Sequence, residues 1–401
     1  MDVEAIRQDF PILSQGMIYL DNASTVLTPK PIIDKIADYY TYYRGNPSRS
    51  IHSFARKAEE KLVEARAISA KFINASPEEI VFTRNTTEGL NLIANGLKLE
   101  DKGNIVVTAL EHHSNFLPWM RRCQREGREF RIVYPKKKDG TITLEDFMEQ
   151  INNQTRLVAL THVSNTLGII LPVQEVVKVA HERNAYVVLD AAQSAPHMPI
   201  NVKQSDVDFL ALSGHKVCGP TSSGLLFIKK EYDNLVEPAY LGGGTVLNVE
   251  PSCFEYINPP SRFEAGTVAH CELMAMADAF EYVARVGLNN IFQHDRQLMK
   301  IGNQLLENVK GIKIYGPPVE DRTSIFAFNI EGIDPTEVAM ILDSSNNIEV
   351  RSGHLCAQVF TKKVLGEPEG IVRASSYFYN TEKEMTMFAE AVKDIVDTMV
   401  S

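Results

Sequence analysis

A lysine at the end of a buried strand could form a Schiff base with a carbonyl compound. Lys216 follows the apolar run 207–212 and precedes the Gly-Pro pair at 219–220, so we expect it at the mouth of a β-sheet. Burial lowers the pKa of a lysine, and the neutral amine is a nucleophile. The alternative is a lysine at a strand end that points into water, which is the usual place for this residue.

A carboxylate closes the preceding apolar run. Asp190 follows residues 186–189, a pattern typical of a buried parallel strand. If both strands belong to one sheet, Asp190 and Lys216 can reach one crevice at the carboxyl ends of its strands. Enzymes that use pyridoxal 5′-phosphate (PLP) combine a Schiff-base lysine with an acid that keeps the pyridine nitrogen protonated. Taken alone, Asp190 could also be an N-cap or turn aspartate.

Two threonines follow another predicted strand and begin a helix. Residues 79–83 form the strand, and Thr86 and Thr87 stand where a helix that runs to Leu97 begins. The start of a helix has free N–H groups and the positive end of the helix dipole, so this pattern indicates a site for a phosphate. Either threonine could instead serve only as the helix cap.

Amide and imidazole side chains end two more predicted strands. Asn165 follows the strand at 157–163 and could donate a hydrogen bond to the phenolic oxygen of PLP, with Gln193 alongside. A turn asparagine is the alternative. His112 and His113 are adjacent, and adjacent residues of an extended chain point in opposite directions, so we expect no metal site there. A flat imidazole at this position could stack on a pyridine ring.

One cysteine lies in a polar loop that also carries positive charge. Cys356 is flanked by Arg351 and His354, and positive charge stabilises the thiolate that attacks sulfur. The alternative is a buried, inert cysteine. Arg373 follows a predicted strand, and its planar guanidinium suits an amino-acid carboxylate, or alternatively a surface salt bridge. The cysteines form no Cys-x-x-Cys pair, so we expect reduced thiols and no zinc or iron–sulfur site: Cys123, Cys218, Cys253, Cys271 and Cys356.

Three of these stretches together resemble the cysteine desulfurases, which are PLP enzymes of fold type I and of the class-V aminotransferase group. They are Leu-Asp-Ala-Ala-Gln-Ser at 189–194, Ser-Gly-His-Lys at 213–216, and Arg-Ser-Gly-His-Leu-Cys-Ala-Gln at 351–358. The resemblance is closest to the SufS-like branch of that family and runs from about residue 19 to residue 380.

The resemblance implies a homodimer that converts L-cysteine to L-alanine and forms a persulfide on Cys356. That sulfur would supply iron–sulfur cluster or thio-cofactor assembly. The implied catalytic residues are Lys216, Cys356 and His112, and Arg373 with Asn165 would bind the substrate. Cofactor contacts are implied for Thr86, Thr87, His112, Asn165, Asp190, Gln193, Ser213, His215 and Lys216, and for Gly266 and Thr267 toward the neighbouring subunit.

The sequence departs from the SufS-like pattern near the thiol and near the lysine. Leu355 stands where a second histidine is usual, and Val359 stands where a proline is usual. Cys218 replaces a common aromatic residue, and Ser222 and Ser223 replace a glycine and an aliphatic residue. These changes leave alternatives open: a selenocysteine lyase, another class-V lyase or aminotransferase, or a weakly active scaffold in a sulfur-assembly complex.

Alternating strands and helices predict an α/β doubly wound layer. With the resemblance, we expect a fold-type I PLP-dependent transferase whose large domain, 15–265, has a mainly parallel seven-stranded sheet flanked by helices. Residues 1–14 and 266–401 should form a smaller α+β domain that carries the Cys356 loop. A long helical stretch should begin at about 262–267. The resemblance places the polar loop at 46–52 near the active site; an ordinary connector between two helices is the alternative.

Composition indicates an ordinary globular protein. The chain has 401 residues and a formal net charge of −10, which argues against nucleic acid or acidic membranes as partners. The N-terminus shows no signal-peptide pattern, and no apolar run has the length of a membrane span. We therefore expect a cytoplasmic protein. The resemblance to the cysteine desulfurases implies that its partners are L-cysteine, a second copy of the chain, and a sulfur-acceptor or scaffold protein.

Overall fold

A mostly parallel sheet forms the centre of the computed structural model, which describes residues 1–47, 51–137 and 139–399. Within these residues it has seven strands, in the order β2-β8-β7-β6-β5-β3-β4. The pairings from β7 to β4 are parallel, whereas β8 is antiparallel to both of its neighbours. This confirms the predicted fold class. The strands are β2 (Ile80–Thr83), β3 (Asn104–Thr108), β4 (Glu129–Val133), β5 (Thr155–Thr161), β6 (Tyr186–Asp190), β7 (Phe209–Ser213) and β8 (Gly224–Ile228).

The central strands are apolar along their length because helices cover both faces of the sheet. In β5, Leu157 and Ala159 belong to one apolar cluster, whereas Val158 and Leu160 belong to another. Helices α4 and α5 pack into the first cluster, and α2, α3, α7 and α9 pack into the second. The helices of this region are α2 (Lys30–Asp38), α3 (Ser53–Phe72), α4 (Thr86–Gly96), α5 (Leu117–Glu126), α6 (Leu144–Gln150), α7 (Val173–His181), α8 (Val202–Ser205) and α9 (His270–Val286).

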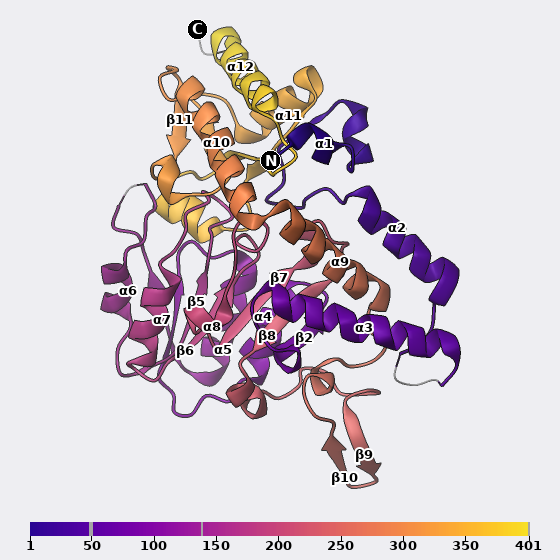
Figure 1. The fold of residues 1–401 in the computed structure, drawn as a ribbon. Helices are drawn as coiled ribbons and strands as arrows, with labels where there is room; N and C mark the ends of the chain where they lie inside the picture. Colours follow the sequence, from indigo (N-terminus) through magenta and orange to yellow (C-terminus); the bar gives the residue numbers. More distant parts are fainter. Residues whose placement is uncertain (48–50, 138, 400–401) are drawn as a thin grey trace.

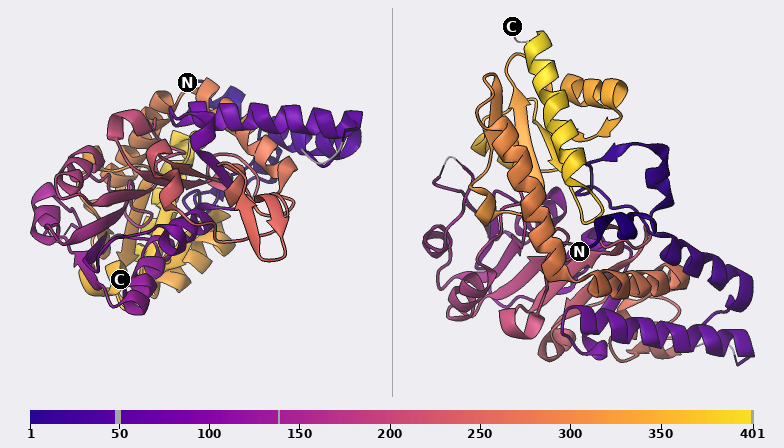
Figure 2. Two further views of the ribbon diagram at one scale, coloured as in Figure 1. Left: turned by 90° about the horizontal axis from the view of Figure 1, so that it is seen from below. Right: turned by 45° about the horizontal axis from the view of Figure 1, so that its top comes forward.

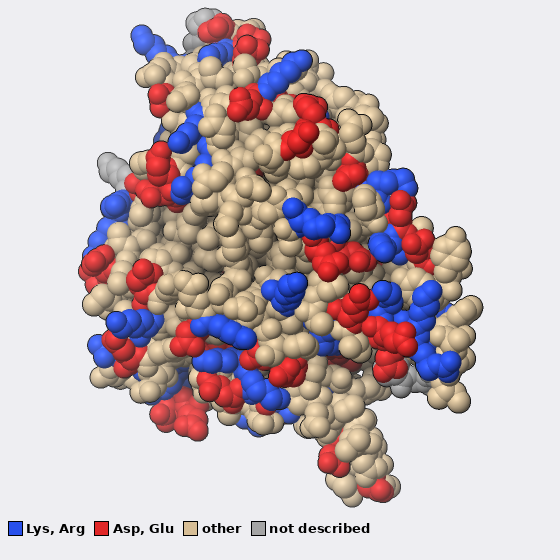
Figure 3. Space-filling view, viewed as in Figure 1, with Lys and Arg blue, Asp and Glu red and all other residues tan. Residues whose placement is uncertain are grey.

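Two peripheral elements were not expected from the sequence. The first is β4, an edge strand whose Glu129 and Arg131 interrupt the apolar pattern; charged residues on edge strands discourage pairing with another chain. The second is a hairpin of β9 (Val246–Glu250) and β10 (Cys253–Tyr256), which projects from the body of the molecule (Figure 1). In the space-filling view the hairpin carries mostly uncharged residues (Figure 3).

A second sheet lies at the opposite end of the molecule from the hairpin (Figure 1). Its strands pair antiparallel in the order β11-β12-β15-β14, and α10 and α12 lie side by side against it (Figure 2). The short β1 pairs with β13 rather than with the central sheet. The elements are α1 (Val3–Arg7), β1 (Ile18–Tyr19), α10 (Leu288–Leu306), β11 (Ile312–Tyr315), β12 (Ile325–Ile330), α11 (Pro335–Asn346), β13 (Ile348–Glu349), β14 (Arg351–Gly353), β15 (Ile371–Ser375) and α12 (Glu382–Met399).

Helix α9 packs with the central sheet, not with the second one. It lies beside α3 (Figure 1), and its apolar residues belong to the cluster that covers one face of the central sheet. The helical stretch expected from about 262 starts later, at His270, because residues 264–269 form a loop after a short 3-10 turn. The division into domains at residue 265 stays a prediction. So does the position of the polar loop at 46–52, of which residues 48–50 lie outside the described residues.

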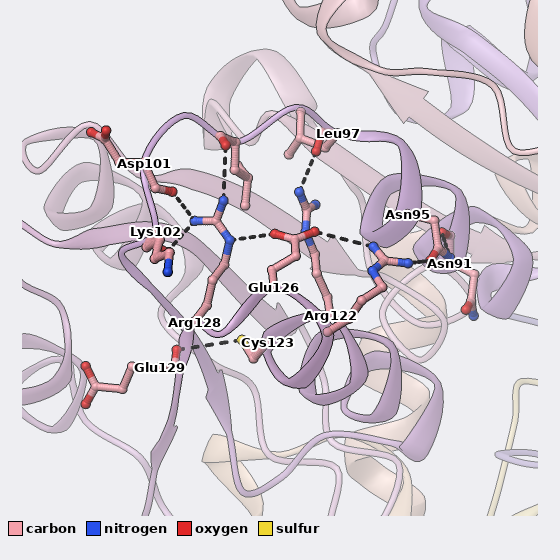
Figure 4. A network of polar contacts seen from close by, with 12 residues as sticks. Asn91, Asn95, Leu97, Asp101, Lys102, Arg122, Cys123, Glu126, Arg128 and Glu129 are labelled. Atoms are coloured by element: carbon pink, nitrogen blue, oxygen red, sulfur yellow. Dashed lines mark hydrogen bonds and ion pairs between the residues drawn. The ribbon is translucent and has the colours of Figure 1, made fainter.

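A network of arginines fixes α5 against the connection between α4 and β3 (Figure 4). Arg122 and Arg128 both bond to Glu126, through Nε–Oε distances of 3.0 and 2.6 Å. Arg122 also donates to the carbonyl of Leu97, and Arg128 to that of Leu99. The backbone of the connection is thereby held by Arg122 of α5 and by Arg128, two residues after that helix ends.

None of the helices in the described part of the chain is long and apolar enough to cross a membrane.

The remaining helical segments are short. The 3-10 turns are η1 (Pro11–Gln15), η3 (Pro77–Glu79), η4 (His113–Asn115), η5 (Gly214–Lys216), η6 (Lys230–Leu235), η7 (Ser261–Phe263) and η8 (Val319–Asp321), and the π-helical segments are η2 (Tyr39–Tyr43) and η9 (Phe360–Val364).

Candidate active site

A cavity of about 230 Å³ lies at the carboxyl ends of β5, β6 and β7. It gathers nine of the predicted site residues, which come from widely separated parts of the chain: Thr86, Thr87, His112, Asn165, Asp190, Gln193, Ser213, His215 and Lys216. The meeting point is the edge at which parallel strands end, as expected from the sequence.

Lys216 reaches this cavity from η5, directly after β7. Burial lowers the pKa of Lys216 to about 8, although the nearby negative charge of Asp190 opposes the shift. The turn is tightly packed: a Cβ on Gly214 would lie 2.2 Å from the hydroxyl oxygen of Ser223. That hydroxyl donates to the carbonyl of Pro220 at 2.7 Å, so Ser223, one of the departures from the SufS-like pattern, closes the Gly-Pro turn.

Asp190 is the last residue of β6 and lies at the same edge of the sheet as Lys216. Burial raises the pKa of its carboxyl group, and the hydrogen bond from the Ala192 N–H at 2.9 Å opposes that shift. Gln193, three residues further along the chain, donates to the Ala23 carbonyl at 2.7 Å and also lines the cavity. A buried carboxylate here can pair with a protonated ring nitrogen.

Hydroxyl groups and a helix start form the other end of the cavity. Asn85 caps α4 by accepting a bond from the Glu88 N–H, so neither Thr86 nor Thr87 is the cap residue. The Thr86 hydroxyl lies 2.7 Å from the Ser213 hydroxyl, which also accepts from the Thr86 N–H. The arrangement of several hydroxyls around a helix N-terminus suits a phosphate.

His112 is held as a neutral imidazole. Its Nδ1 accepts a bond from the Ser114 N–H at 3.1 Å, which leaves the hydrogen on Nε2. Burial, reinforced by the positive charge of Lys216, lowers the pKa of His112 to about 3. The ring lines the cavity together with His215, whose pKa burial lowers to about 4.

Glu111 supports this part of the site and was not identified from the sequence. Its carboxylate accepts bonds from the Thr108 hydroxyl, the Thr161 N–H and the Asn115 amide, at 2.6, 2.9 and 2.6 Å. Burial raises the pKa of Glu111 to about 8. The three bonds join the ends of β3 and β5 to η4, and so fix the two histidines that follow Glu111.

Arg373 is buried, not part of a surface salt bridge. Its Nη2 donates to Asp21 at 2.9 Å and to Ser24 at 2.7 Å, and its Nη1 donates to the backbone oxygen of Asn165 at 2.9 Å. Asp21 and Ser24 were not identified from the sequence, because they follow a two-residue strand and carry no motif of their own.

Two buried polar atoms in this neighbourhood have no hydrogen-bond partner among the described residues: Nε of Arg373 and Oδ1 of Asn165. A bound ligand with polar groups would satisfy them. The Asn165 amide nitrogen carries two hydrogens, and its bond to the Leu355 carbonyl at 2.8 Å uses one. Together with the amine of Lys216, the carboxylate of Asp190 and the hydroxyl-lined helix start, these groups fit PLP and an amino-acid carboxylate.

Cys356 and Cys218 differ sharply in their surroundings. Cys356 is exposed, on the loop between β14 and η9. It is absent from the described lining of the cavity, but a negative charge on its sulfur would raise the pKa of both Lys216 and Arg373. Cys218 is fully buried, and burial raises the pKa of its thiol.

Gly266 and Thr267 lie outside the Lys216 cavity as far as its described lining goes. Thr267 lines a neighbouring cavity of about 1010 Å³, which shares Asn85 and Thr87 with the first. Gly266 has a positive φ of 81°, in the region that favours glycine, and its N–H donates to Gly243.

Comparison with known proteins identifies the family. The family model described as aminotransferase class-V matches residues 18–388. A protein of Pyrococcus abyssi named "Probable cysteine desulfurase" is 41% identical over 402 residues, which cover 99% of this chain and 98% of the relative. The chain belongs to the class-V aminotransferase family.

Solved structures of two cysteine desulfurases have the same fold as this chain. The apo structure of a cysteine desulfurase from Thermococcus onnurineus NA1 aligns with a TM-score of 0.94 at 40% identity, covering 99% of this chain and 98% of that one. The cysteine desulfurase CsdA (S-sulfonic acid) from Escherichia coli aligns with a TM-score of 0.92 at 29% identity, covering 99% of both chains. The class-V likeness therefore extends over both sheets and includes the Cys356 loop.

Proposed function

We propose that this protein is a PLP-dependent cysteine desulfurase that converts L-cysteine to L-alanine and leaves a persulfide on Cys356. The main support is that the exposed thiol of Cys356 lies on a loop that is hydrogen-bonded to a residue of the cavity lining. Asn165, which lines the cavity, donates to the carbonyl of Leu355. The names of its relatives support this activity.

Lys216 would hold PLP covalently through its Nζ, and Asp190 would pair with the ring nitrogen. When bound, PLP supplies an electron sink for the substrate carbon that carries the amine. His112 would lie against the ring, while Thr86, Thr87, Ser213 and His215 would hold the phosphate end with the start of α4. Once freed, the Lys216 amine, whose pKa of about 8 lies near neutrality, can take up and return a proton at the substrate carbon.

Arg373 would bind the carboxylate of L-cysteine, with Asn165 beside it. The Cys356 thiolate would then attack the substrate sulfur: an S–S bond forms as the C–S bond of the substrate breaks. The electron pair of the C–S bond stays with the carbon fragment, which takes up protons and leaves as L-alanine. No other oxidant or reductant is consumed, and Cys356 carries the sulfur to an acceptor protein for iron–sulfur cluster or thio-cofactor assembly.

The working unit would be a homodimer. Thr267 lines the neighbouring cavity and is absent from the described lining of the Lys216 cavity in its own chain, and we propose that Gly266 and Thr267 complete the phosphate site of the second copy. The hairpin offers an apolar surface for that contact, because Leu247, Val249 and Phe254 are exposed. We also propose a SufS-like assignment, a cytoplasmic location, and the domain division 15–265 against 1–14 with 266–401.

Alanine formation with a persulfide measurement tests the activity. Cys356→Ser should still bind PLP and L-cysteine but lose most alanine formation and the extra sulfur on the protein. Cys253→Ser is the matched control, because Cys253 is the other exposed thiol in the described chain and lies on the hairpin. Full activity of Cys356→Ser would favour a selenocysteine lyase or another class-V lyase, and inactivity of the unaltered protein would favour a scaffold.

A further inference from the structure

We propose that His113 is a positioning residue whose imidazole holds the Cys356 loop against the cavity. Three bonds join this loop to the central sheet. Asn165 Nδ2 donates to the Leu355 carbonyl at 2.8 Å, the His113 N–H donates to the Cys356 carbonyl at 2.7 Å, and the Gln358 N–H donates to Nε2 of His113 at 3.2 Å. That the loop carries sulfur on Cys356 rests on the proposed function, whereas the three bonds are independent of it.

The bond to Nε2 satisfies an N–H group that the local structure leaves open. Gln358 begins the helical turn that leads into η9, and the first N–H groups of a helix have no partner within it. His113 comes from η4, a different element, and so acts as a cap from outside. Its ring must be neutral, with its hydrogen on Nδ1, to accept this bond. Burial lowers the pKa of His113, which favours that form.

The loop needs such support because its backbone is strained. Leu355 and Cys356 have positive φ angles of 53° and 55°, and side chains other than glycine rarely adopt this region. Residues persist there only when the surroundings hold them. Leu355 is 7% exposed and belongs to the apolar cluster that contains Val158 and Leu160. This departure from the SufS-like pattern therefore anchors the loop in the apolar core. Cys356 itself stays exposed, and its carbonyl accepts from the His113 N–H.

His113 is well placed to align the thiol with the cofactor site. It directly follows His112, and the two ring centroids are 6.3 Å apart. His112 lines the cavity, while His113 reaches the loop. Glu111 fixes the turn that carries both, through its bonds to Thr108, Thr161 and Asn115. The turn that carries His112 therefore also sets the position of Cys356, through His113.

Amide hydrogen exchange of the PLP-bound protein without substrate tests the contact directly. His113→Ala removes the acceptor but keeps the backbone N–H, so exchange in residues 354–361 should rise by about three- to tenfold, the effect of losing one ordinary hydrogen bond. His113→Gln should restore protection, since its side-chain oxygen can accept from Gln358. Gln358→Ala, which deletes only an exposed side chain and keeps the N–H donor, is the matched control and should behave as the unaltered protein.

Turnover separates positioning from a general structural role. In His113→Ala, kcat for alanine formation should fall by about three- to tenfold with KM for L-cysteine unchanged, and His113→Gln should recover most of it. Unchanged exchange at 354–361, or faster exchange across the whole chain, would overturn the inference, as would equal effects of Gln358→Ala. If the unaltered protein forms no alanine, the proposed function fails, while the exchange result still decides whether His113 holds the loop.

Discussion

The side-chain amide of Asn165 donates to the carbonyl of Leu355, so a residue that lines the Lys216 cavity holds the residue that precedes the exposed thiol. The two are separated by 190 positions in the sequence. The same asparagine accepts from Arg373 through its backbone oxygen. One residue thus links the proposed cofactor site, the proposed carboxylate site and the proposed sulfur-carrying loop.

Attachment of PLP should depend on pH through Lys216. Because burial lowers its pKa to about 8, the reactive neutral amine is scarce at pH 6 and predominates above pH 9. The rate at which PLP-free protein takes up PLP, followed by visible absorbance, should rise with pH and reach half of its maximum near pH 8. Lys216→Ala should hold no PLP that borohydride can fix covalently. A flat rate profile, or covalent PLP in Lys216→Ala, would contradict the assignment.

Arg373→Ala should weaken L-cysteine binding while PLP stays bound. Loss of a buried, charged hydrogen-bond partner costs about 2–5 kcal/mol, which corresponds to a KM increase of about 30-fold or more. Steady-state kinetics gives the value. Asp21→Asn is the control, since it removes the ion-pair partner of Arg373 but leaves the guanidinium in place. An equal KM increase in both variants would mean that Arg373 acts through its structural pair.

Cys218→Ser should change stability more than activity. The thiol has no exposed surface, and a hydroxyl placed there without a partner costs about 1–3 kcal/mol. Urea unfolding should show that loss. Mass measurement after one turnover with L-cysteine should still locate the extra sulfur on Cys356. Sulfur found on Cys218 would reverse the roles of the two thiols.

Charges on the hairpin should dissociate the proposed dimer. Leu247 and Val249 are 68% and 64% exposed, so a Leu247→Asp, Val249→Asp double variant should fold normally and sediment as a monomer. Its activity should fall, because Thr267 would no longer reach a second copy. Met340→Asp is the control, since Met340 is 65% exposed on α11, away from the hairpin. An active monomer would refute the dimer and the role of Thr267.

Residues that close apolar runs could be predicted from the sequence, and residues that depend on distant partners could not. Asp190 ends one strand and Lys216 follows the next, and both strands are buried on both faces, so their shared edge follows from the strand pattern alone. Asp21 and Arg373 are 352 positions apart, and nothing local in residues 21–24 indicates a bond to β15. The strand β4 was not predicted because its charged residues Glu129 and Arg131, which are suited to an edge strand, interrupt the apolar pattern by which the other strands were recognised.

The consecutive placement of His112 and His113 bears on how the site responds to thermal motion. Both belong to one turn that Glu111 ties to β3 and β5. A displacement of that turn carries the cofactor face and the thiol loop in the same direction, so it changes their separation little. The distance between the proposed cofactor site and the proposed sulfur carrier should therefore change little when the surrounding edge of the sheet moves.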